Sequence, residues 1–352
     1  EEAGKFCTNE LLPINRSGDA DGIHWDPETK AVTTAPGFKE AYDKFVENGL
    51  VGIGHSAQWG GSGAPHVVSM AINEMVTATN KSFSMCPGLG NGLIESLTAH
   101  GSKEQQDYFL PKLIGGEWAS TMCLTEPQCG TDLGLISTKA TPEGDHYKLT
   151  GTKIWITFGE HDLTENIIHL VLARLPDAPE GIKGISVFIV PKILKDGTRN
   201  SIDCTGLEHK MGIHASPTCV MTMEDAEGYL VGEPHKGMRA MFTMMNTARI
   251  GVGLEGVALS EISYQTALAF CKDRRQSRSL DSAKRDSNAS ADNIMVHPDV
   301  RRQLLTIKAS TEAIRGLAYF TAVNFDIGHR HPDEATRQEA NDLVALLTPI
   351  VK

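Results

Sequence analysis

The spacing of apolar residues is helical in the first third of the chain. Phe38, Ala41, Tyr42 and Phe45 recur at positions i, i+3, i+4 and i+7, and residues 70–75 and 93–97 show similar spacing. Apolar residues at these intervals lie along one face of an α-helix. The pattern predicts a helical N-terminal domain over residues 1–117.

The pattern changes to short strands between about residues 118 and 232. Lys148, Thr150 and Lys153 alternate with apolar or small neighbours, and residues 167–172 and 185–190 are rich in β-branched side chains. Residues 142–145 and 195–197 contain the Pro, Gly and Asp that are typical of turns. We predict a small antiparallel β-barrel or sandwich as the middle domain, residues 118–232.

Helical spacing returns after residue 232. Met238, Met241, Phe242 and Met245 lie on one face of a long helix that should run to about Lys272. A methionine stripe at this spacing favours core packing over a substrate lining, although Met245 can serve both purposes. A second helix should span about residues 299–328.

The remaining C-terminal residues complete the predicted α+β fold. Residues 276–293 are rich in Ser, Asp, Asn and Lys and predict a mobile loop. A last helix begins near Pro332 and reaches Lys352 without a stop signal. We therefore predict a helical-bundle C-terminal domain over residues 233–352 that is incomplete, in a chain truncated at both ends.

Composition excludes several classes of protein. The chain has 352 residues and a net charge of −11, and its longest basic cluster, residues 272–278, is interrupted by Asp, Gln and Ser, which argues against a nucleic-acid partner. No apolar run reaches the roughly 18 residues that a membrane-spanning helix needs. The seven cysteines are scattered, without zinc spacing, so we expect no metal site, reduced thiols and a cytoplasmic location.

Two blocks of sequence contain the candidate chemistry. Residues 121–132 read Thr-Met-Cys-Leu-Thr-Glu-Pro-Gln-Cys-Gly-Thr-Asp, and residues 153–157 read Lys-Ile-Trp-Ile-Thr at the end of a predicted strand. The first block alone could be a strand that ends in a loop. Together with the helices that follow, the two blocks resemble the acyl-CoA dehydrogenase family over roughly residues 35–350.

The resemblance implies that FAD is the cofactor and that the first block lines it. Met122, Leu124 and Thr125 would lie along the flavin, with the Thr125 hydroxyl directed at the N5/O4 edge of the ring. Gly130 and Thr131 would lie near the cofactor pyrophosphate, and Thr131 also near the pantetheine of the substrate. The protein would supply orientation and electrostatics, while the flavin supplies the redox chemistry.

The resemblance assigns five more residues to the cofactor. Trp155 would pack beside the isoalloxazine, with Ile156 and Thr157 at its edge; an ordinary core position for this indole is the alternative. Arg274 and Gln276 would reach the FAD of a partner subunit, which implies a homodimer or homotetramer. A solvated helix end is the alternative for these two.

Asn246 and Arg249 are the candidate substrate residues, together with Thr131. Their spacing of three places both on one face of a helix. By resemblance, that face meets the CoA thioester arm. An exposed capping or surface role remains open for Asn246.

The resemblance also implies the reaction, the α,β-dehydrogenation of a short- or medium-chain acyl-CoA. A carboxylate removes the α-proton while the β-hydrogen leaves as a hydride to flavin N5. We find no catalytic base in the chain, because the position before Arg249 is Ala248 and Glu255 matches neither family location. We therefore expect the base, a Glu, beyond Lys352, and expect residues 1–352 alone to bind FAD partially or not at all.

Within the family, the chain is most similar to a larger bacterial branch that includes 3-methylmercaptopropionyl-CoA dehydrogenases. Electron-transfer flavoprotein is the expected electron acceptor, and 3-methylthiopropanoyl-CoA is one candidate substrate. An acyl-CoA oxidase and a non-enzymatic acyl-CoA-binding paralogue remain alternatives.

Three further motifs have simpler interpretations. Residues 251–256 match G-x-G-x-x-G but lie in a predicted helix, so these glycines should permit close helix packing rather than bind a dinucleotide. The glycine-rich residues 59–65 should form a tight surface connection rather than a phosphate loop. His209 and His214 should hold a turn rather than act as acid–base groups.

Overall fold

The computed structural model describes residues 1–352 apart from Met244 and Asn246. The chain divides into two compact units, unit 1 (Glu1–Ala248) and unit 2 (Arg249–Lys352). The predicted domain boundaries at residues 117 and 232 both fall inside unit 1.

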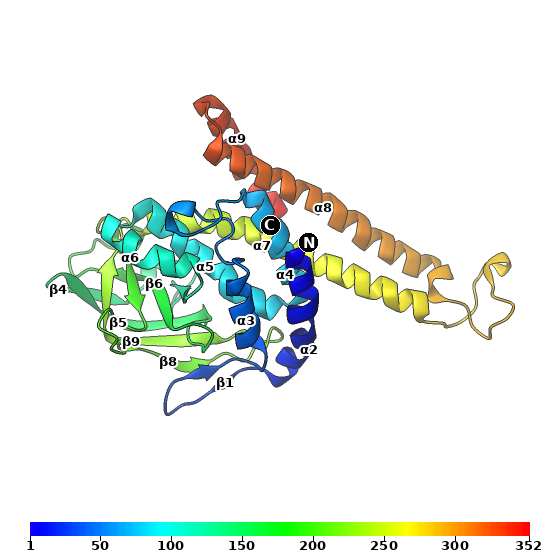
Figure 1. Ribbon diagram of the computed structural model, residues 1–352, viewed down its shortest axis with the longest axis horizontal. Coiled ribbons are helices and arrows are strands. Elements are labelled where there is room, and N and C mark those ends of the chain that lie inside the picture. The colour runs from blue at the N-terminus through cyan, green and yellow to red at the C-terminus, as the bar shows by residue number, and fades with distance from the viewer. The chain divides into compact units, whose positions relative to one another are not determined.

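The N-terminal part of unit 1 is helical, as predicted (Figure 1). Its main helices are α1 (Glu2–Phe6), α2 (Leu12–Asp21), α3 (Phe38–Glu47), α4 (His66–Thr79), α5 (Lys81–His100) and α6 (Lys103–Ile114), with a π-helical turn, Cys7–Leu11, between α1 and α2.

The predicted apolar face of α3 is buried. Phe38, Tyr42 and Phe45 surround Phe83 of α5, with ring centroids 5.7 to 6.4 Å from it. The Asn80 side chain accepts a hydrogen bond from the Phe83 amide at 3.0 Å, so this N-cap holds the start of α5 and with it the central ring.

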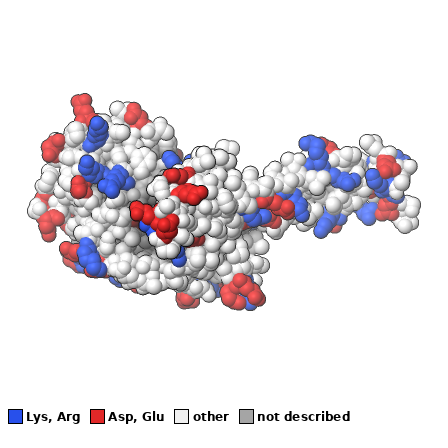
Figure 2. All heavy atoms as spheres, turned by 90° about the horizontal axis from the view of Figure 1, so that it is seen from above, with Lys and Arg blue, Asp and Glu red and all other residues white. Residues whose placement is uncertain are grey.

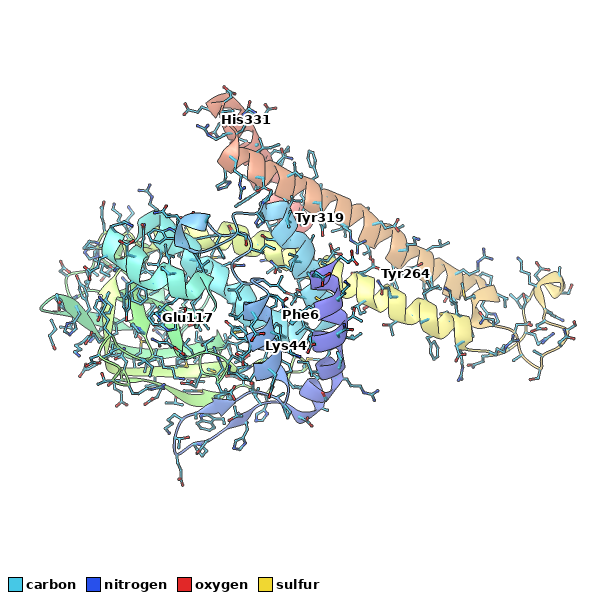
Figure 3. All side chains as sticks on the ribbon, in the orientation of Figure 1. Phe6, Lys44, Glu117, Tyr264, Tyr319 and His331 are labelled. Atoms are coloured by element: carbon cyan, nitrogen blue, oxygen red, sulfur yellow. The ribbon has the colours of Figure 1, made fainter. Side chains whose placement is uncertain are left out.

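Sequence analysis did not identify the elements before residue 37. These are α1, α2 and a two-stranded sheet of β1 (His24–Trp25) and β2 (Val32–Thr33). The Trp25 indole donates to the Cys204 carbonyl at 3.1 Å, and the Lys44 ammonium is 2.6 Å from the Glu10 carboxylate; Phe6 and Lys44 are labelled in Figure 3. α1, β1 and β2 have too few residues for a periodic pattern, and α2 buries only Gly18 and so has no apolar face to detect. Long-range contacts hold these elements.

A seven-stranded sheet forms the middle part of unit 1. Its strands are β3 (Trp118–Cys123), β4 (Lys139–Glu143), β5 (His146–Thr157), β6 (Asn166–Arg174), β7 (Ile185–Pro191), β8 (Ile202–Leu207) and β9 (Thr218–Leu230). The order is β3-β6-β4-β5-β9-β7, with β8 on β9, and an additional β6–β7 pairing closes five of the strands into a ring.

Most of these pairings are antiparallel, as expected, but β3 is an exception. It runs parallel to β6, from Trp118 opposite Asn166 to Cys123 opposite Val171, and β4 meets β6 in parallel at one residue pair. The middle domain is therefore mostly antiparallel, with β3 as the parallel strand that the sequence did not predict. A short apolar strand has no sequence signal for the direction of its neighbour, and here residues 124–165, which include the β4–β5 hairpin, provide the crossover.

The three predicted C-terminal helices are present. They are α7 (Gly237–Asp273), which continues from unit 1 into unit 2, α8 (Pro298–Arg330) and α9 (Glu334–Val351). Inside unit 2, Arg315 of α8 binds Glu261 of α7 at 2.8 Å, and the Lys308 ammonium lies 5.9 Å from the ring of Tyr264, which Figure 3 labels.

The G-x-G-x-x-G match lies inside α7, so its rejection as a dinucleotide site is confirmed. A Cβ added to Gly253 would lie 2.5 Å from a Val351 side-chain carbon, whereas Gly251 and Gly256 have open space. Only Gly253 among the three therefore permits the close packing of α7 against the end of α9.

The segment predicted as a mobile loop is held by internal hydrogen bonds. The Asp292 carboxylate accepts from the amides of Ser279 and Asp286 at 2.7 Å each, and Arg278 lies 3.4 Å from it. Arg278 also donates to the Ala289 carbonyl at 2.6 Å. The polar residues that predicted mobility instead bind one another, a pairing that composition does not reveal.

Three apolar clusters form the core, and their fully buried members all lie between Phe6 and Met241 of the described residues. No described helix combines the length and hydropathy that crossing a bilayer requires. Basic and acidic side chains are interspersed on the face that Figure 2 shows, without a broad basic region.

Candidate functional site

A tight turn at the end of β3 brings Thr125 beside Gly130. Glu126 and Cys129 exchange two backbone hydrogen bonds, of 2.8 and 3.0 Å, across Pro127 and Gln128. A Cβ built on Gly130 would lie 3.4 Å from the Thr125 methyl group. The first block is therefore folded back on itself, so its threonine and its glycine lie on one small surface.

Backbone pairing joins the two sequence blocks. The Ile154 amide donates to the Thr125 carbonyl at 2.9 Å, so the strand that contains Trp155 runs beside the residue predicted to face the flavin. Residues about 30 apart in sequence thus form one edge of the middle domain. The structure places Thr125, Gly130 and the strand segment that contains Trp155 at this edge.

Trp155 lies on a β-bulge of β5. Lys153 pairs with Met221 of β9 and Ile156 pairs with Cys219, so β5 has one extra residue between these positions. Trp155 has the left-handed φ of 60°, and its side chain is 59% exposed. A bulge redirects the side chain of its extra residue. The indole is therefore outside the core, which excludes the ordinary core position for it.

Ile156 and Thr157 differ from each other in environment. The Ile156 side chain is 2% exposed and belongs to a core cluster, so any contact between Ile156 and a cofactor would use its backbone. Thr157 is half-buried, and its hydroxyl makes no hydrogen bond within the described residues. The bulge turns the Ile156 side chain inward, and the predicted contact of Ile156 with the edge of the ring remains a prediction.

Met122 and Leu124 alternate with buried residues at the end of β3. Both are partly buried and pack against the core cluster that contains Leu93 and Met241; Met245 packs there too. Thr121 and Cys123 point to the opposite, fully buried side. Met122 and Leu124 thus provide an apolar surface next to Thr125.

The polar groups around this surface fit a bound dinucleotide. Within the part of the chain that the structure describes, the Thr125 and Thr131 hydroxyls and the Gly130 and Thr131 amides have no hydrogen-bond partner. Gly130 and Thr131 are exposed, and successive free amides in a loop form an anion-binding concavity. These residues match the hydroxyl, amide and indole set that FAD requires.

A buried ion pair lies directly behind this surface. The Lys153 ammonium is 2.8 Å from Glu126 Oε1 and donates to the Leu124 carbonyl at 3.0 Å, and the exposed fractions of the two charged side chains are 0% and 1%. The other carboxylate oxygen, Oε2, accepts from the Ser137 amide at 2.7 Å and the Gln128 amide group at 2.6 Å. Thr138 donates to Oε1 from both its amide and its hydroxyl.

The electrostatics of this pair favour ionised Glu126. Burial alone raises the pKa of the carboxyl, but the Lys153 charge and the hydrogen bonds from Thr138 and Ser137 lower it to about 2. Burial lowers the pKa of Lys153, and Glu126 only partly opposes this. Both pKa values are lowered, which favours the charged form of Glu126 and disfavours the charged form of Lys153. Burial therefore opposes the lysine charge, and the attraction to Glu126 offsets part of that cost.

Glu126 and Lys153 lie within the two motif blocks, but the motifs alone predict no role for them. Counting alternate positions from the buried Leu149 places Lys153 on the inner face of β5, where a lysine requires an acidic partner. That parity was the available signal. The sequence contains no signal for the identity of the acidic partner, because the partner depends on the turn that places Glu126 under β5.

The predicted substrate and partner-subunit residues lie mostly in unit 2. Asn246 lies outside the described residues, and Arg249 is the first residue of unit 2. Arg274 and Gln276 are both exposed, and the Arg274 guanidinium donates to the Gln276 side chain at 3.1 Å. The chain thus brings these two together at the end of α7, and their predicted contact with a partner's FAD remains a prediction.

The carboxyl groups of α5 and α7 do not reveal a base. Burial raises the pKa of Glu95 on α5 to about 7, and a hydrogen bond with Thr247 partly opposes the shift. Ala248, at the alternative base position of the family, is exposed and has no acid–base group. A general base therefore stays unassigned among the described residues.

The glycine-rich loop is closed by its own backbone. Ser62 and Gly63 donate to the carbonyls of Gly52 and His55, at 3.0 and 2.8 Å, and Ala64 donates to Ile53. With these amides used internally, the structure supports a surface connection rather than a phosphate loop.

His214 also has a structural position. Its two ring nitrogens lie 3.2 Å from the Asp19 carbonyl and 2.9 Å from the Lys210 carbonyl. The ring therefore holds the loop before β9 to α2, as predicted.

Comparisons with known proteins agree with these features. The family model "Acyl-CoA dehydrogenase, N-terminal domain" matches residues 1–117, and "Acyl-CoA dehydrogenase, middle domain" matches residues 121–226. Among the relatives, 3-methylmercaptopropionyl-CoA dehydrogenase of Ruegeria pomeroyi is 48% identical over 100% of this chain. The chain spans 60% of the length of that relative.

Two further matches extend the comparison. The short-chain specific acyl-CoA dehydrogenase of Clostridium acetobutylicum is 32% identical over 79% of this chain and 68% of its own. The structure of butyryl-CoA dehydrogenase from Megasphaera elsdenii superposes with a TM-score of 0.76 at 25% identity, covering 99% of this chain and 83% of that one. The chain therefore belongs to the acyl-CoA dehydrogenase family, whose members use FAD.

Proposed function

We propose that the protein catalyses the FAD-dependent α,β-dehydrogenation of a short- or medium-chain acyl-CoA thioester. The observation that carries the proposal is the exposed Trp155 indole on a bulge of β5, one residue after the Ile154 amide that bonds to the Thr125 carbonyl. Family membership supports the same reaction. Bound FAD would supply the hydride acceptor.

The residues of unit 1 would bind and orient the cofactor. Trp155 would cover one flank of the flavin ring. Met122 and Leu124 would exclude water from the surface next to the Thr125 hydroxyl. Gly130 and Thr131 would hold the pyrophosphate through their free amides. Ile156 would contribute only backbone groups, and the Thr157 hydroxyl would donate at the edge of the ring.

We propose that Arg249 and Asn246 of α7 contact the thioester arm of the substrate. Thr131, in the first motif block, would contact the pantetheine. The α-proton requires a carboxylate base, which we propose to be a Glu outside residues 1–352. The 48% identity to a 3-methylmercaptopropionyl-CoA dehydrogenase supports 3-methylthiopropanoyl-CoA as one substrate.

An anaerobic titration tests this function. The full-length product of the native gene, in which we propose the base lies, is loaded with FAD and mixed with butyryl-, 3-methylthiopropanoyl- or palmitoyl-CoA. The loss of the flavin absorption band is then followed. We expect bleaching with the first two and a weaker response with the third. Protein that takes up FAD but is bleached by none of them would favour the non-enzymatic acyl-CoA-binding alternative, and peroxide formation in air would favour an oxidase.

We also propose an oligomer that passes electrons to electron-transfer flavoprotein. Large apolar side chains are exposed along α8 and α9 of unit 2, and Arg274 and Gln276 are paired at an exposed position. A homodimer or homotetramer would cover such faces. Sedimentation of the FAD-loaded protein, with and without the Arg274→Ala substitution, measures the assembly.

A cytoplasmic location is supported by the cysteines. All seven are unpaired and buried, which fits a reducing compartment. Fractionation of cells that express the native gene measures the location.

A further inference from the structure

We infer that the buried Glu126–Lys153 pair acts as a positioning device that sets Thr125 and Trp155 in place for the flavin. This inference rests on the proposed FAD site. Neither side chain reaches the surface, so neither touches the cofactor. Their effect on the cofactor is therefore transmitted through the backbone of the two blocks.

The contacts of the pair lie on both sides of the proposed site. Lys153 holds the Leu124 carbonyl, one residue before Thr125, and is itself two residues before Trp155. Glu126 is the residue after Thr125. A single ion pair thus fixes the neighbours of Thr125 and the start of the bulge together.

The bulge needs such an anchor because its conformation is unfavourable. A tryptophan with φ of 60° persists only where the surrounding structure determines it. Ile156 anchors the far end in the core, and Lys153 anchors the near end. Without the second anchor, β5 can lose the extra residue by shifting its register, which would turn the indole to another direction.

Stability alone does not explain two buried charges. Replacing a buried ion pair by apolar or neutral residues of similar size is often neutral or stabilising, whereas removing one partner leaves an unpaired buried charge. A buried ion pair that contributes little net stability can still fix the positions of the residues around it. Such a pair is expected where those positions matter for function. The pair lies directly behind the site proposed for the cofactor.

The test compares single and double substitutions. Lys153→Met and Glu126→Gln each leave one charge unpaired, so both should lower the melting temperature. The double variant Lys153→Met/Glu126→Gln has no unpaired charge and should recover most of the stability. The positions of Thr125 and Trp155 should not recover with the stability. In the double variant no ammonium group binds the Leu124 carbonyl or the side chain at position 126.

Two measurements report on geometry. The first is the dissociation constant for FAD, which we expect to weaken roughly tenfold in the double variant, equivalent to about 1.4 kcal/mol. The second is the ¹⁹F spectrum of apo protein labelled with 5-fluorotryptophan, in which Trp155→Phe assigns one resonance among the four tryptophans. In the double variant, we expect the Trp155 resonance to shift or broaden, while the resonances of the other three tryptophans stay unchanged.

Lys192→Met is the matched control in the same domain. It removes a lysine that pairs with the buried Glu160, which keeps Arg199 as a second partner at 3.0 Å. This variant should lose some stability yet leave the FAD affinity and the Trp155 resonance unchanged.

Each outcome decides between the proposals. A double variant that matches the unsubstituted protein in FAD affinity and in the Trp155 resonance would overturn the positioning role. Failure of the unsubstituted full-length gene product, which is the protein used for the FAD measurements, to bind FAD would instead refute the proposed function. The ¹⁹F spectrum of the apo protein would still test the anchor.

Discussion

Units 1 and 2 use their apolar residues in opposite ways. In unit 1 the apolar side chains fill three core clusters, and large side chains such as Phe38, Phe83 and Phe188 are fully buried. In unit 2, Ile250, Leu254 and Leu304 are buried, but more of the large apolar residues are exposed to solvent. These exposed residues are Val252, Leu259, Phe270, Leu280, Leu305, Ile314, Phe320, Val323, Leu346 and Ile350.

The difference shows which unit is self-sufficient. A domain whose large apolar residues are enclosed owes its stability to its own chain, whereas helices with exposed apolar faces require another surface to cover them. The residues that we propose to hold the FAD of the same chain, such as Thr125 and Trp155, lie in the enclosed unit. The residues predicted to meet a partner subunit, Arg274 and Gln276, are found in the other.

The largest effect should come from the aromatic core of unit 1. Phe83→Ala removes the ring around which Phe38, Tyr42 and Phe45 pack, and should lower the free energy of unfolding by about 3–5 kcal/mol. Urea unfolding followed by circular dichroism measures the loss. Phe83→Leu, which keeps much of the volume, should cost less; a loss below about 1 kcal/mol for the alanine variant would contradict an enclosed core.

The burial of Glu95 makes the free energy of unfolding of unit 1 depend on pH. Burial raises the pKa of Glu95 to about 7. Between the usual pKa of a glutamate and pH 7, the unfolded chain therefore releases a proton that the folded chain keeps. The free energy of unfolding falls as the pH rises through this range. Glu95→Gln should therefore stabilise the protein by roughly 1–3 kcal/mol at pH 8 and hardly at all at pH 4.5. Unfolding curves at the two pH values measure this, and an equal change at both would contradict the shift.

Helix packing in unit 2 should respond to one glycine. Gly253→Ala places a Cβ against the backbone and side chain of Val351 and should cost about 1–3 kcal/mol. Gly256→Ala is the control, because its Cβ would enter open space, and it should stabilise α7 by up to about 1 kcal/mol. Thermal unfolding of both variants separates the two effects. Similar melting temperatures would show that α7 and α9 do not pack closely at Gly253.

The smallest effect on stability should come from an exposed apolar residue of unit 2. Phe320 is 53% exposed, so Phe320→Ser should change the unfolding free energy of the isolated chain by no more than about 0.5 kcal/mol. It should nevertheless weaken self-association, which light scattering over a range of concentrations measures. A strong destabilisation without any change in association would mean that this face is packed within the chain itself.

The sequence by itself determined the local properties of this protein. Periodicity located α3, α7 and α8 and the strands β6 and β7, because spacing of apolar residues reflects one face of a single element. The helical context also excluded residues 251–256 as a dinucleotide loop. The two motif blocks identified the family, although the individual roles of the site residues and the domain boundaries remain predictions.

Only the tertiary structure decided how the blocks fit together. The parallel direction of β3, the inward side chain of Ile156 and the outward indole of Trp155 all depend on pairings with strands distant in sequence. The burial of Lys153 depends on Glu126, which a turn places under β5. Alternation along β5 predicts the inner face for Lys153, but only a partner that neutralises its charge allows the side chain to lie there, and the sequence does not identify that partner.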